Sequence, residues 1–224
     1  MQVLVAGSTG NTGQRLVREL HERGLNPVAM VRESSDISGL PEGVAQRQAD
    51  LTDLSDDITE GCDVVVFAAG SGGDTSAEMT DKVDRDGAKK LIDLSVANGV
   101  RRFVMLSSIG AGDPDPDHEL GHYLQAKHEA DEHLKATDLE YAILRPVALT
   151  DESGTGEVRL GEAVVLDVRL APPTRRTYPR RTPDMAGSEE DCPSYLGSDR
   201  AGALYDGDLG RALHHLGKEI LAIW

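Results

Sequence analysis

Cysteine and long apolar runs are scarce in this chain of 224 residues. Its two cysteines, Cys62 and Cys192, fit neither a metal-ligand spacing nor a disulfide framework, which is typical of a reducing compartment. No stretch approaches the roughly 20 apolar residues that cross a bilayer, and no basic leader precedes the first apolar run. The sequence therefore predicts a soluble cytoplasmic protein that has no metal site and does not contact membranes.

Lysine is also scarce, and acidic residues dominate the charge. Only 6 of the 23 basic residues are lysine, whereas 23 of the 39 acidic residues are aspartate, and the formal net charge is −16. Such a charge argues against binding nucleic acid through a general basic surface. A surface poor in lysine and rich in aspartate is typical of adaptation to high salt, where screening relieves self-repulsion. The composition favours a halophilic protein, with an ordinary acidic cytosolic protein as the alternative.

The first thirteen residues are expected to form a strand, a glycine turn and the start of a helix. Residues 3–6 are an apolar run, and a helical pattern begins at Arg15. Three glycines spaced three apart lie between them, which allows a sharp turn and a close approach of a ligand to the backbone. The helix N-terminus then offers free N–H groups and the positive end of its dipole to phosphates. We expect this turn to bind a dinucleotide through Gly7, Ser8, Thr9, Gly10, Asn11, Thr12 and Gly13; in the alternative the glycines only shape a tight turn.

Apolar runs alternate with helical segments along the chain. The run at residues 63–70 is nearly continuous β-branched and apolar sequence, as in a strand that helices cover on both faces. Further strands are expected at residues 26–31, 44–49, 101–106 and 139–144, and helices at 78–98 and around 123–134. This alternation predicts an α/β fold with a doubly wound parallel sheet in the order 3-2-1-4-5-6, the Rossmann arrangement.

Residues at the ends of the predicted strands indicate which dinucleotide binds. At the tip of the second strand, Arg32 stands where an acidic residue would bind a ribose 2′-hydroxyl, and a guanidinium pairs well with a 2′-phosphate. The sequence therefore favours NADP over NAD, with a solvated surface arginine as the alternative. Asp50 could meet the adenine end of the cofactor. The other expected cofactor contacts are Leu51 and the small residues that end the fourth strand, Ala68, Ala69 and Gly70.

Ser108, Tyr123 and Lys127 form the candidate acid/base group. Tyr123 and Lys127 are four residues apart, so they share one face of a helix, and Ser108 follows the neighbouring strand. A phenol works as an acid or base near neutrality only if its anion is stabilised, which the Lys127 ammonium would do while it also binds the nicotinamide ribose. A serine hydroxyl can orient the substrate while hydride passes to or from the cofactor. In the alternative, Tyr123 and Lys127 are unrelated residues of a helix surface.

Five motifs, in their order and spacing, resemble those of the short-chain dehydrogenase/reductases: GSTGNTG, the strand at residues 63–70, VMLSSIGA, YLQAK and LEYAILRP. The short length and the segment at residues 145–150 are most similar to the atypical, NmrA-like NAD(P)-binding branch, often described as sugar epimerases or dehydratases. The resemblance implies that Tyr123 is the acid/base, Lys127 its partner and Ser108, rather than Ser107, the orienting hydroxyl.

The same resemblance implies an NAD(P)-dependent oxidoreductase or epimerase-like enzyme that acts on a small carbonyl or hydroxyl substrate. We expect it to be a monomer or a homodimer. Several members of the branch are redox-sensing regulators that act through a protein partner. A non-catalytic NADP-binding regulator is therefore the alternative.

The resemblance covers residues 1–165, the expected dinucleotide-binding domain, and leaves residues 166–224 as a small C-terminal lobe on the substrate side. Residues 152–166 resemble the family's hairpin after the sixth strand, but residues 169–181 then bring five arginines and several prolines into an acidic chain. One interpretation is a long basic loop or lid over the substrate pocket. The other is translation out of frame: residues 175–182, written in GC-rich codons and shifted by two bases, can encode the acidic isoleucine-proline segment that the family usually has here.

Overall fold

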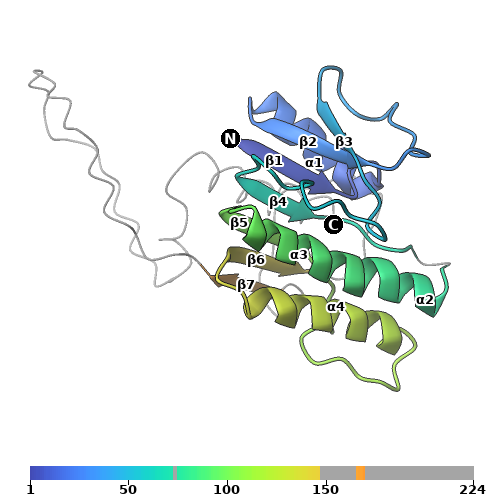
Figure 1. The fold of residues 1–224 in the computed structure, drawn as a ribbon. Coiled ribbons are helices and arrows are strands. Elements are labelled where there is room, and N and C mark those ends of the chain that lie inside the picture. The colour runs from blue at the N-terminus through green and yellow to red at the C-terminus, as the bar shows by residue number, and fades with distance from the viewer. Residues whose placement is uncertain (73–74, 147–164, 170–224) are drawn as a thin grey trace, which may run out of the picture.

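The computed structural model of this protein describes residues 1–72, 75–146 and 165–169 (Figure 1). Its elements in chain order are β1 (Gln2–Ala6), α1 (Asn11–Glu22), β2 (Asn26–Val31), β3 (Ala45–Gln48), β4 (Val64–Phe67), α2 (Ala77–Thr80), the π-helical segment η1 (Asp81–Gly87), α3 (Ala88–Ala97), β5 (Arg102–Leu106), α4 (Gly121–Lys135), β6 (Glu140–Arg145) and β7 (Val165–Arg169). Within these described ranges, no helix is both long and apolar enough to span a membrane.

The strands form one sheet in the order β3-β2-β1-β4-β5-β6-β7. The first six strands are parallel, with Val3 of β1 opposite Val64 of β4, and β7 runs antiparallel to β6. This confirms the predicted Rossmann fold and the order 3-2-1-4-5-6. The edge strand β7 adds to that prediction, because its residues lie at and beyond the end of the hairpin expected at residues 152–166.

Two apolar layers cover the faces of the sheet. Val3 and Val5 of β1 belong to the layer that packs against α1, whereas Leu4 and Ala6 belong to the layer that packs against α3 and α4. This alternation follows from the two-residue period of a strand. Because both layers are apolar, β1 and β4 are buried along nearly their whole length. Figure 1 shows α3 and α4 side by side across one face of the sheet.

The helix expected at residues 78–98 is a composite of α2, η1 and α3. It begins after Ser76, whose side-chain oxygen accepts a hydrogen bond from the Met79 N–H at 3.2 Å. Its middle section, Asp81–Gly87, is π-helical. π turns are frequent at functional sites. Because a π turn holds more residues than an α turn, it changes which side chains of the helix face the carboxyl ends of the strands.

The division of the chain into residues 1–165 and 166–224 stays a prediction. The basic segment at residues 169–181, interpreted as a lid or as an out-of-frame stretch, lies outside the described residues except for Arg169, the last residue of β7.

Candidate functional site

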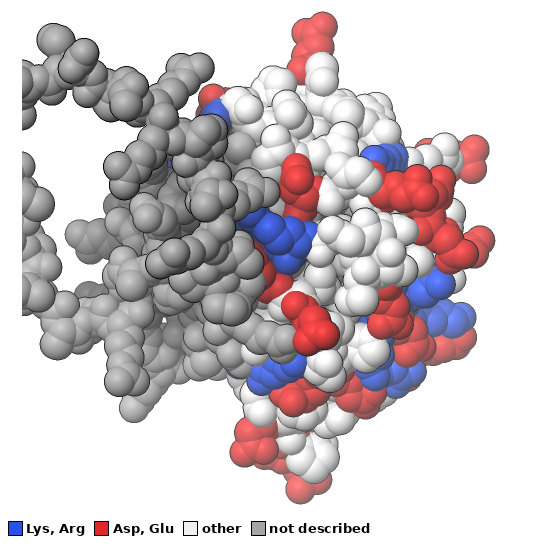
Figure 2. All heavy atoms as spheres, turned by 60° about the vertical axis from the view of Figure 1, so that its left-hand side comes forward, with Lys and Arg blue, Asp and Glu red and all other residues white. Residues whose placement is uncertain are grey.

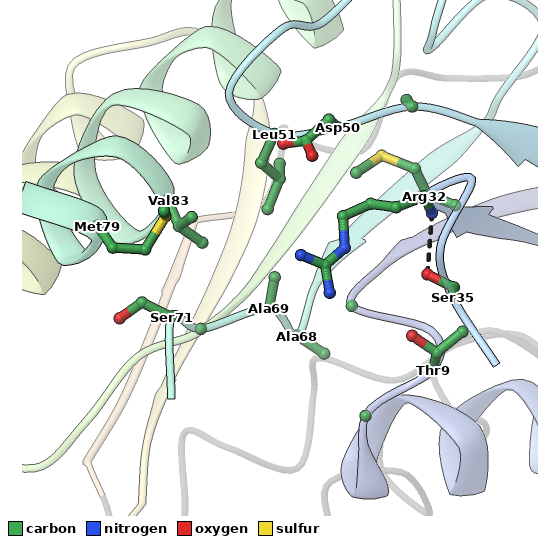
Figure 3. A pocket seen from close by; sticks show the side chains of 15 residues that line it. Thr9, Arg32, Ser35, Asp50, Leu51, Ala68, Ala69, Ser71, Met79 and Val83 are labelled. Atoms are coloured by element: carbon green, nitrogen blue, oxygen red, sulfur yellow. Dashed lines mark hydrogen bonds between the residues drawn. The ribbon is translucent and has the colours of Figure 1, made fainter. Parts of the chain in front are cut away.

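The carboxyl ends of β1, β2 and β4 surround a cavity of about 370 Å³ (Figure 3). Strand order reverses between β1 and β4, and open α/β sheets bind ligands in the crevice at such a point. The residues that line it come from the glycine turn, from the ends of β2 and β4, and from the composite helix: Gly7, Thr9, Gly10, Met30, Arg32, Ser35, Ala49, Asp50, Leu51, Ala68, Ala69, Gly70, Ser71, Met79 and Val83.

The three glycines of the turn are required for different structural reasons. Gly7 has a φ of +81°, and a Cβ there would lie 2.7 Å from the backbone of Ala68. A Cβ on Gly13 would overlap the carbonyl oxygen of Gly7, whereas at Gly10 the nearest atom would be 3.5 Å away. Gly7 and Gly13 therefore let β1, α1 and β4 pack closely, and Gly10 leaves the backbone open toward the cavity.

The N-terminus of α1 is suited to an anion. Its first turn contains no acidic residue, and no side chain of the described residues caps it. Its N–H groups and the positive end of its dipole lie beside the glycine turn, which is the arrangement that binds a pyrophosphate. The geometry of the glycine turn and the N-terminus of α1 therefore fits the pyrophosphate of a dinucleotide.

Arg32 and Asp50 give the cavity its charged groups. Arg32 directly follows β2, and Figure 3 shows its guanidinium extending into the cavity between Thr9 and Asp50. Its backbone N–H donates to the Ser35 hydroxyl at 3.0 Å. Hydrogen bonds from the backbone and side chain of Thr52, at 2.9 and 2.8 Å, lower the pKa of Asp50 against the effect of its burial, and the charge of Arg32 adds to this. Asp50 is therefore a carboxylate at neutral pH.

Lys127 lies behind the cavity wall on α4, one turn after Tyr123. Its ammonium nitrogen is 5.7 Å from the centre of the Tyr123 ring and 2.9 Å from a carboxylate oxygen of Asp84. It also donates to the carbonyl oxygen of Ala69 at 3.2 Å. Burial alone would lower the pKa of Lys127, but the charge of Asp84, with Tyr123 and Asp131, outweighs burial and raises the pKa above its ordinary value. Lys127 is therefore an ammonium ion at neutral pH.

The two serines after β5 have different surroundings. The buried Ser107 donates its hydroxyl to Asp131 at 2.8 Å, and its backbone N–H donates to Leu144 at 2.8 Å. Ser108 is half-buried, and its hydroxyl donates to the adjacent carbonyl of Ile109 in a longer bond of 3.3 Å. Of the two hydroxyls, that of Ser108 has the weaker partner and can be exchanged for a substrate oxygen at lower cost.

Comparison with known proteins identifies the family. A family model described as NAD(P)H-binding matches residues 7–167, which include the glycine turn, the cavity and α4. The chain belongs to this NAD(P)H-binding family. The match agrees with the resemblance to the atypical short-chain dehydrogenase/reductases that the motifs carry.

Relatives of this NAD(P)H-binding protein are named as epimerases and oxidoreductases. An uncharacterised sugar epimerase of Bacillus subtilis is 38% identical over 164 residues, which are 70% of this chain and 77% of that protein. A solved structure from Bacillus halodurans, named as an NAD-dependent epimerase/dehydratase, is 40% identical with a TM-score of 0.66 and covers 71% of this chain and 76% of its own. The oxidoreductase ylbE from Lactococcus lactis is 30% identical with a TM-score of 0.61, over 70% and 73% of the two chains.

The cavity brings together most of the residues that the sequence predicts for cofactor binding. Nine of them line it: Gly7, Thr9, Gly10, Arg32, Asp50, Leu51, Ala68, Ala69 and Gly70. Within the described part of the chain, the lining leaves out Ser8, Asn11, Thr12, Gly13 and Lys127. Ser8 is buried and donates its hydroxyl to the Met30 carbonyl at 2.7 Å, and Asn11 and Thr12 begin α1. Which of these residues contact NAD(P)H stays a prediction.

Sequence reasoning missed the residues that the composite helix brings to the site. Met79 and Val83 line the cavity, and Asp84 holds Lys127. The apolar spacing predicted the helix at residues 78–98, which contains Val83, but not which of its faces meets the cavity. It gave no signal for Asp84, because a carboxylate in a charged stretch reads as a solvated residue until the π turn is known.

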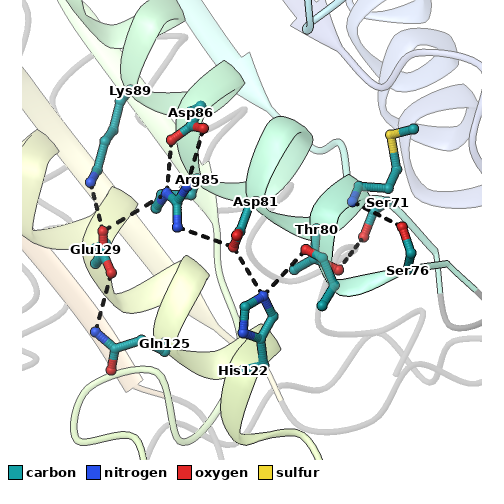
Figure 4. Close-up of polar contacts among 12 residues, drawn as sticks. Ser71, Ser76, Thr80, Asp81, Arg85, Asp86, Lys89, His122, Gln125 and Glu129 are labelled. Carbon is teal, nitrogen blue, oxygen red and sulfur yellow. Dashed lines mark hydrogen bonds and ion pairs between the residues drawn. The ribbon is translucent and has the colours of Figure 1, made fainter.

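Surface ion pairs fix α4 against η1 and α3 (Figure 4). Lys89 of α3 pairs with Glu129 of α4 at 2.9 Å, and the His122 ring of α4 lies 3.0 Å from the carboxylate of Asp81 in η1. Within η1, Asp81 also pairs with Arg85 at 3.1 Å. Exposed pairs of this kind contribute little each, about 0 to 1 kcal/mol, but several of them along one helix pair set its register. Tyr123 and Lys127 therefore lie on a helix whose position relative to η1 is well defined.

Proposed function

We propose that this protein is an NADP-dependent oxidoreductase or epimerase-like enzyme that acts on a small carbonyl or hydroxyl substrate. The observation that carries the proposal is the buried Lys127 ammonium, 5.7 Å from the Tyr123 ring and hydrogen-bonded to Ala69 in the wall of the cavity. A nicotinamide cofactor, when bound, supplies or accepts the hydride. The protein's own residues supply binding, orientation and the proton.

Each part of the site has a role in this proposal. The glycine turn and the N-terminus of α1 bind the pyrophosphate, and Arg32 binds the ribose 2′-phosphate. The Tyr123 hydroxyl gives a proton to the substrate oxygen or takes one from it, and the Lys127 ammonium stabilises the phenolate. The Ser108 hydroxyl donates to the same substrate oxygen and fixes its direction.

The relatives support both reaction types. The Bacillus subtilis relative is named as a sugar epimerase, and the Lactococcus lactis structure as an oxidoreductase. Both reactions begin with hydride transfer at a carbon that bears an oxygen, and both need a proton donor or acceptor at that oxygen. The same residue roles therefore serve an oxidoreductase and an epimerase.

Replacement of the Tyr123 hydroxyl tests catalysis. In Tyr123→Phe we expect the Kd for NADPH to stay close to that of the parent, while turnover falls at least about a hundredfold, because the proton donor is lost and the fold is kept. Turnover is measured as NADPH oxidation over a panel of small aldehydes, ketones and keto sugars. If no compound of the panel is turned over while NADPH binds, the non-catalytic regulator is favoured and the enzyme proposal fails.

Replacement of the Arg32 guanidinium tests the choice of cofactor. In Arg32→Ala we expect the Kd for NADPH to rise about tenfold or more with little change in that for NADH, because only NADPH carries the 2′-phosphate. Arg101→Ala is the matched control. Arg101 is exposed and lies at the amino end of β5, whereas the cavity lies at the carboxyl ends of the strands. A parent protein that binds NADH more tightly than NADPH would overturn this part of the proposal.

A further inference from the structure

Asp84 is a fully buried carboxylate that the proposed chemistry does not yet use. It lies in the π-helical segment η1 and has no exposed surface. Burial of a carboxylate is costly unless charges and hydrogen bonds compensate it. Its contacts therefore indicate what keeps it in place.

The contacts of Asp84 join α4, the helix that carries Tyr123 and Lys127, to the wall of the cavity. One carboxylate oxygen, Oδ1, lies 2.9 Å from the Lys127 ammonium of α4. The other, Oδ2, accepts the backbone N–H of Ser71 at 2.9 Å. Lys127 in turn donates to the carbonyl of Ala69 at 3.2 Å. Residues 69–71, which we call the wall segment, all line the cavity and are held from both sides by this ion pair.

The backbone around Asp84 is shaped for close approach. A Cβ on Gly70 would lie 3.4 Å from Oδ1 of Asp84, so the glycine brings the wall segment directly onto the carboxylate. On the same helix, a Cβ on Gly87 would lie 2.8 Å from the carbonyl oxygen of Leu51. The π-helical segment thus packs against two parts of the cavity, and Val83, beside Asp84, lines it directly.

The charged and polar groups that face Lys127 come from four elements. Asp84 faces it from η1, Tyr123 and Asp131 from its own helix, and the carbonyls of Ala69 and Leu106 from the ends of β4 and β5. Asp131 is engaged by Arg145 at 2.9 Å. Asp84 makes the largest contribution to raising the pKa of Lys127 against the effect of burial.

We propose that Asp84 is a positioning residue, whose carboxylate holds the Lys127 ammonium and the wall segment of the cofactor cavity in one fixed arrangement. The inference rests on the proposed function, in which Lys127 supports Tyr123 and the cavity binds NADPH. Without Asp84, the buried Lys127 loses its counter-charge and becomes a neutral amine as the pH rises. A neutral amine neither stabilises a phenolate nor holds the Ala69 carbonyl as strongly.

The charge of Lys127 can be followed directly, because the chain contains only six lysines. Lysine labelled with ¹³C at Cε gives one NMR signal for each, and Lys127→Met identifies the signal of Lys127. In the parent we expect this signal to stay that of an ammonium up to at least pH 10.5, the ordinary pKa of lysine. In Asp84→Asn we expect it to titrate at least about one pH unit lower.

Asp86→Asn is the matched control for this titration. Asp86 belongs to the same π-helical segment, but its carboxylate is half-exposed and pairs with Arg85 at 2.7 Å. We expect the Lys127 signal of this variant to titrate as in the parent. A Lys127 signal that titrates in Asp84→Asn as it does in the parent would overturn the proposal.

Binding of NADPH between pH 6 and pH 10 separates positioning from mere support of the fold. In Asp84→Asn we expect the Kd to rise with pH as Lys127 loses its charge, and in Lys127→Met we expect it to be raised at every pH. If Asp84 only supports the fold, Asp84→Asn will unfold at a lower urea concentration than the parent, but its Kd for NADPH will depend on pH as that of the parent does. That result would count against the proposal. If the parent binds no NADPH, the proposed function fails, whereas the lysine titration still tests Asp84.

The double variant Asp84→Asn/Lys127→Met covers the case in which Asp84→Asn does not fold. Removal of both charges avoids an unpaired buried ion, so this variant is expected to unfold at a higher urea concentration than Asp84→Asn. If Asp84 acts through Lys127, the double variant binds NADPH as Lys127→Met does. A double variant that binds NADPH as tightly as the parent contradicts the proposal.

Discussion

Single residues in the glycine turn determine how closely the backbone of β1 meets its neighbours. Gly7 and Gly13 have no room for a side chain, and Gly10 has room but faces the cavity. The regular spacing of the three glycines therefore hides three different constraints. Substitutions at these positions are expected to affect different properties of the protein.

A pair of alanine substitutions separates folding from binding in this turn. In Gly13→Ala the new methyl group overlaps the Gly7 carbonyl, so we expect a loss of about 1 to 3 kcal/mol in the free energy of unfolding. In Gly10→Ala the φ of −76° suits alanine and the nearest atom is 3.5 Å away, so stability is kept while NADPH binds more weakly. Urea unfolding and NADPH titration measure the two effects. A Gly13→Ala protein as stable as the parent would contradict the packing described for this turn.

The site was predictable where a residue type and its spacing reflect local chemistry. Arg32 could be placed at the cavity because it ends a strand next to a glycine turn, and both Arg32 and Gly7 line the cavity. Asp84 could not be predicted, because its burial depends on how the composite helix meets α4. Its role appears only when residues far apart in the sequence, such as Asp84 and Lys127, are brought together.

At the level of elements, α4 is joined to its surroundings by two buried ion pairs spaced one turn apart. Lys127 pairs with Asp84 of η1, and Asp131 pairs with Arg145 at the end of β6 at 2.9 Å. Asp131 also accepts the Ser107 hydroxyl. Burial raises the pKa of Asp131, against the lowering effects of Ser107 and Arg145. The helix that carries Tyr123 is therefore held against the sheet by buried charges.

Removal of Arg145 should make the stability depend on pH in a defined direction. In Arg145→Met, Asp131 stays buried without its counter-charge, and we expect a loss of about 3 to 5 kcal/mol at neutral pH. Because the folded-state pKa of Asp131 lies above its ordinary value, the native state takes up the proton first as the pH falls. Loss of Arg145, which lowers the pKa of Asp131, raises that pKa further in the variant, so the deficit relative to the parent is full above the variant's pKa and shrinks as the pH falls through it. Unfolding in urea at a series of pH values measures this, with exposed Arg101→Met as the control; a deficit independent of pH would contradict it.

Most elements were predictable because the apolar runs of the strands and the apolar spacing of the helices are both clear in this sequence. Five of the six parallel strands are short apolar runs, whereas β3 has the polar sequence AQRQ, and the strand order follows from the Rossmann pattern. The strand predicted at residues 26–31 has the bounds of β2, and the ends of the other strands differ from the predicted ends by at most three residues, as for Val64–Phe67 within residues 63–70. The π-helical segment was not predictable, since an apolar spacing of three or four residues does not distinguish an α turn from a π turn.

At the scale of the whole molecule, the charge is negative and widely spread. The net charge is −16, and Figure 2 shows acidic side chains distributed over the visible face of the described residues rather than gathered in one patch. Like charges spread over a surface in this way repel one another in dilute buffer. This repulsion is expected to make the stability of the fold depend on salt.

Salt should stabilise this protein if its composition is an adaptation to high salt. Between 0.1 and 1 M salt the screening length falls from about 10 Å to about 3 Å, which removes most of the repulsion between exposed carboxylates. We expect the thermal midpoint to rise steeply with KCl over this range, and sucrose, which does not screen charge, to raise it much less. Equal effects of KCl and sucrose would favour an ordinary acidic protein.

The π-helical segment also matters for sequence comparison. A turn closed by i to i+5 hydrogen bonds holds one residue more than a turn of an α-helix, so Asp81–Gly87 has the geometry of a helix with a one-residue insertion. Relatives with an uninterrupted α-helix here would need a one-residue gap in the alignment beside Asp84. Without that gap, positions on one side of the gap would be paired about 100° out of phase around the helix axis, and the counterpart of Asp84 would be missed.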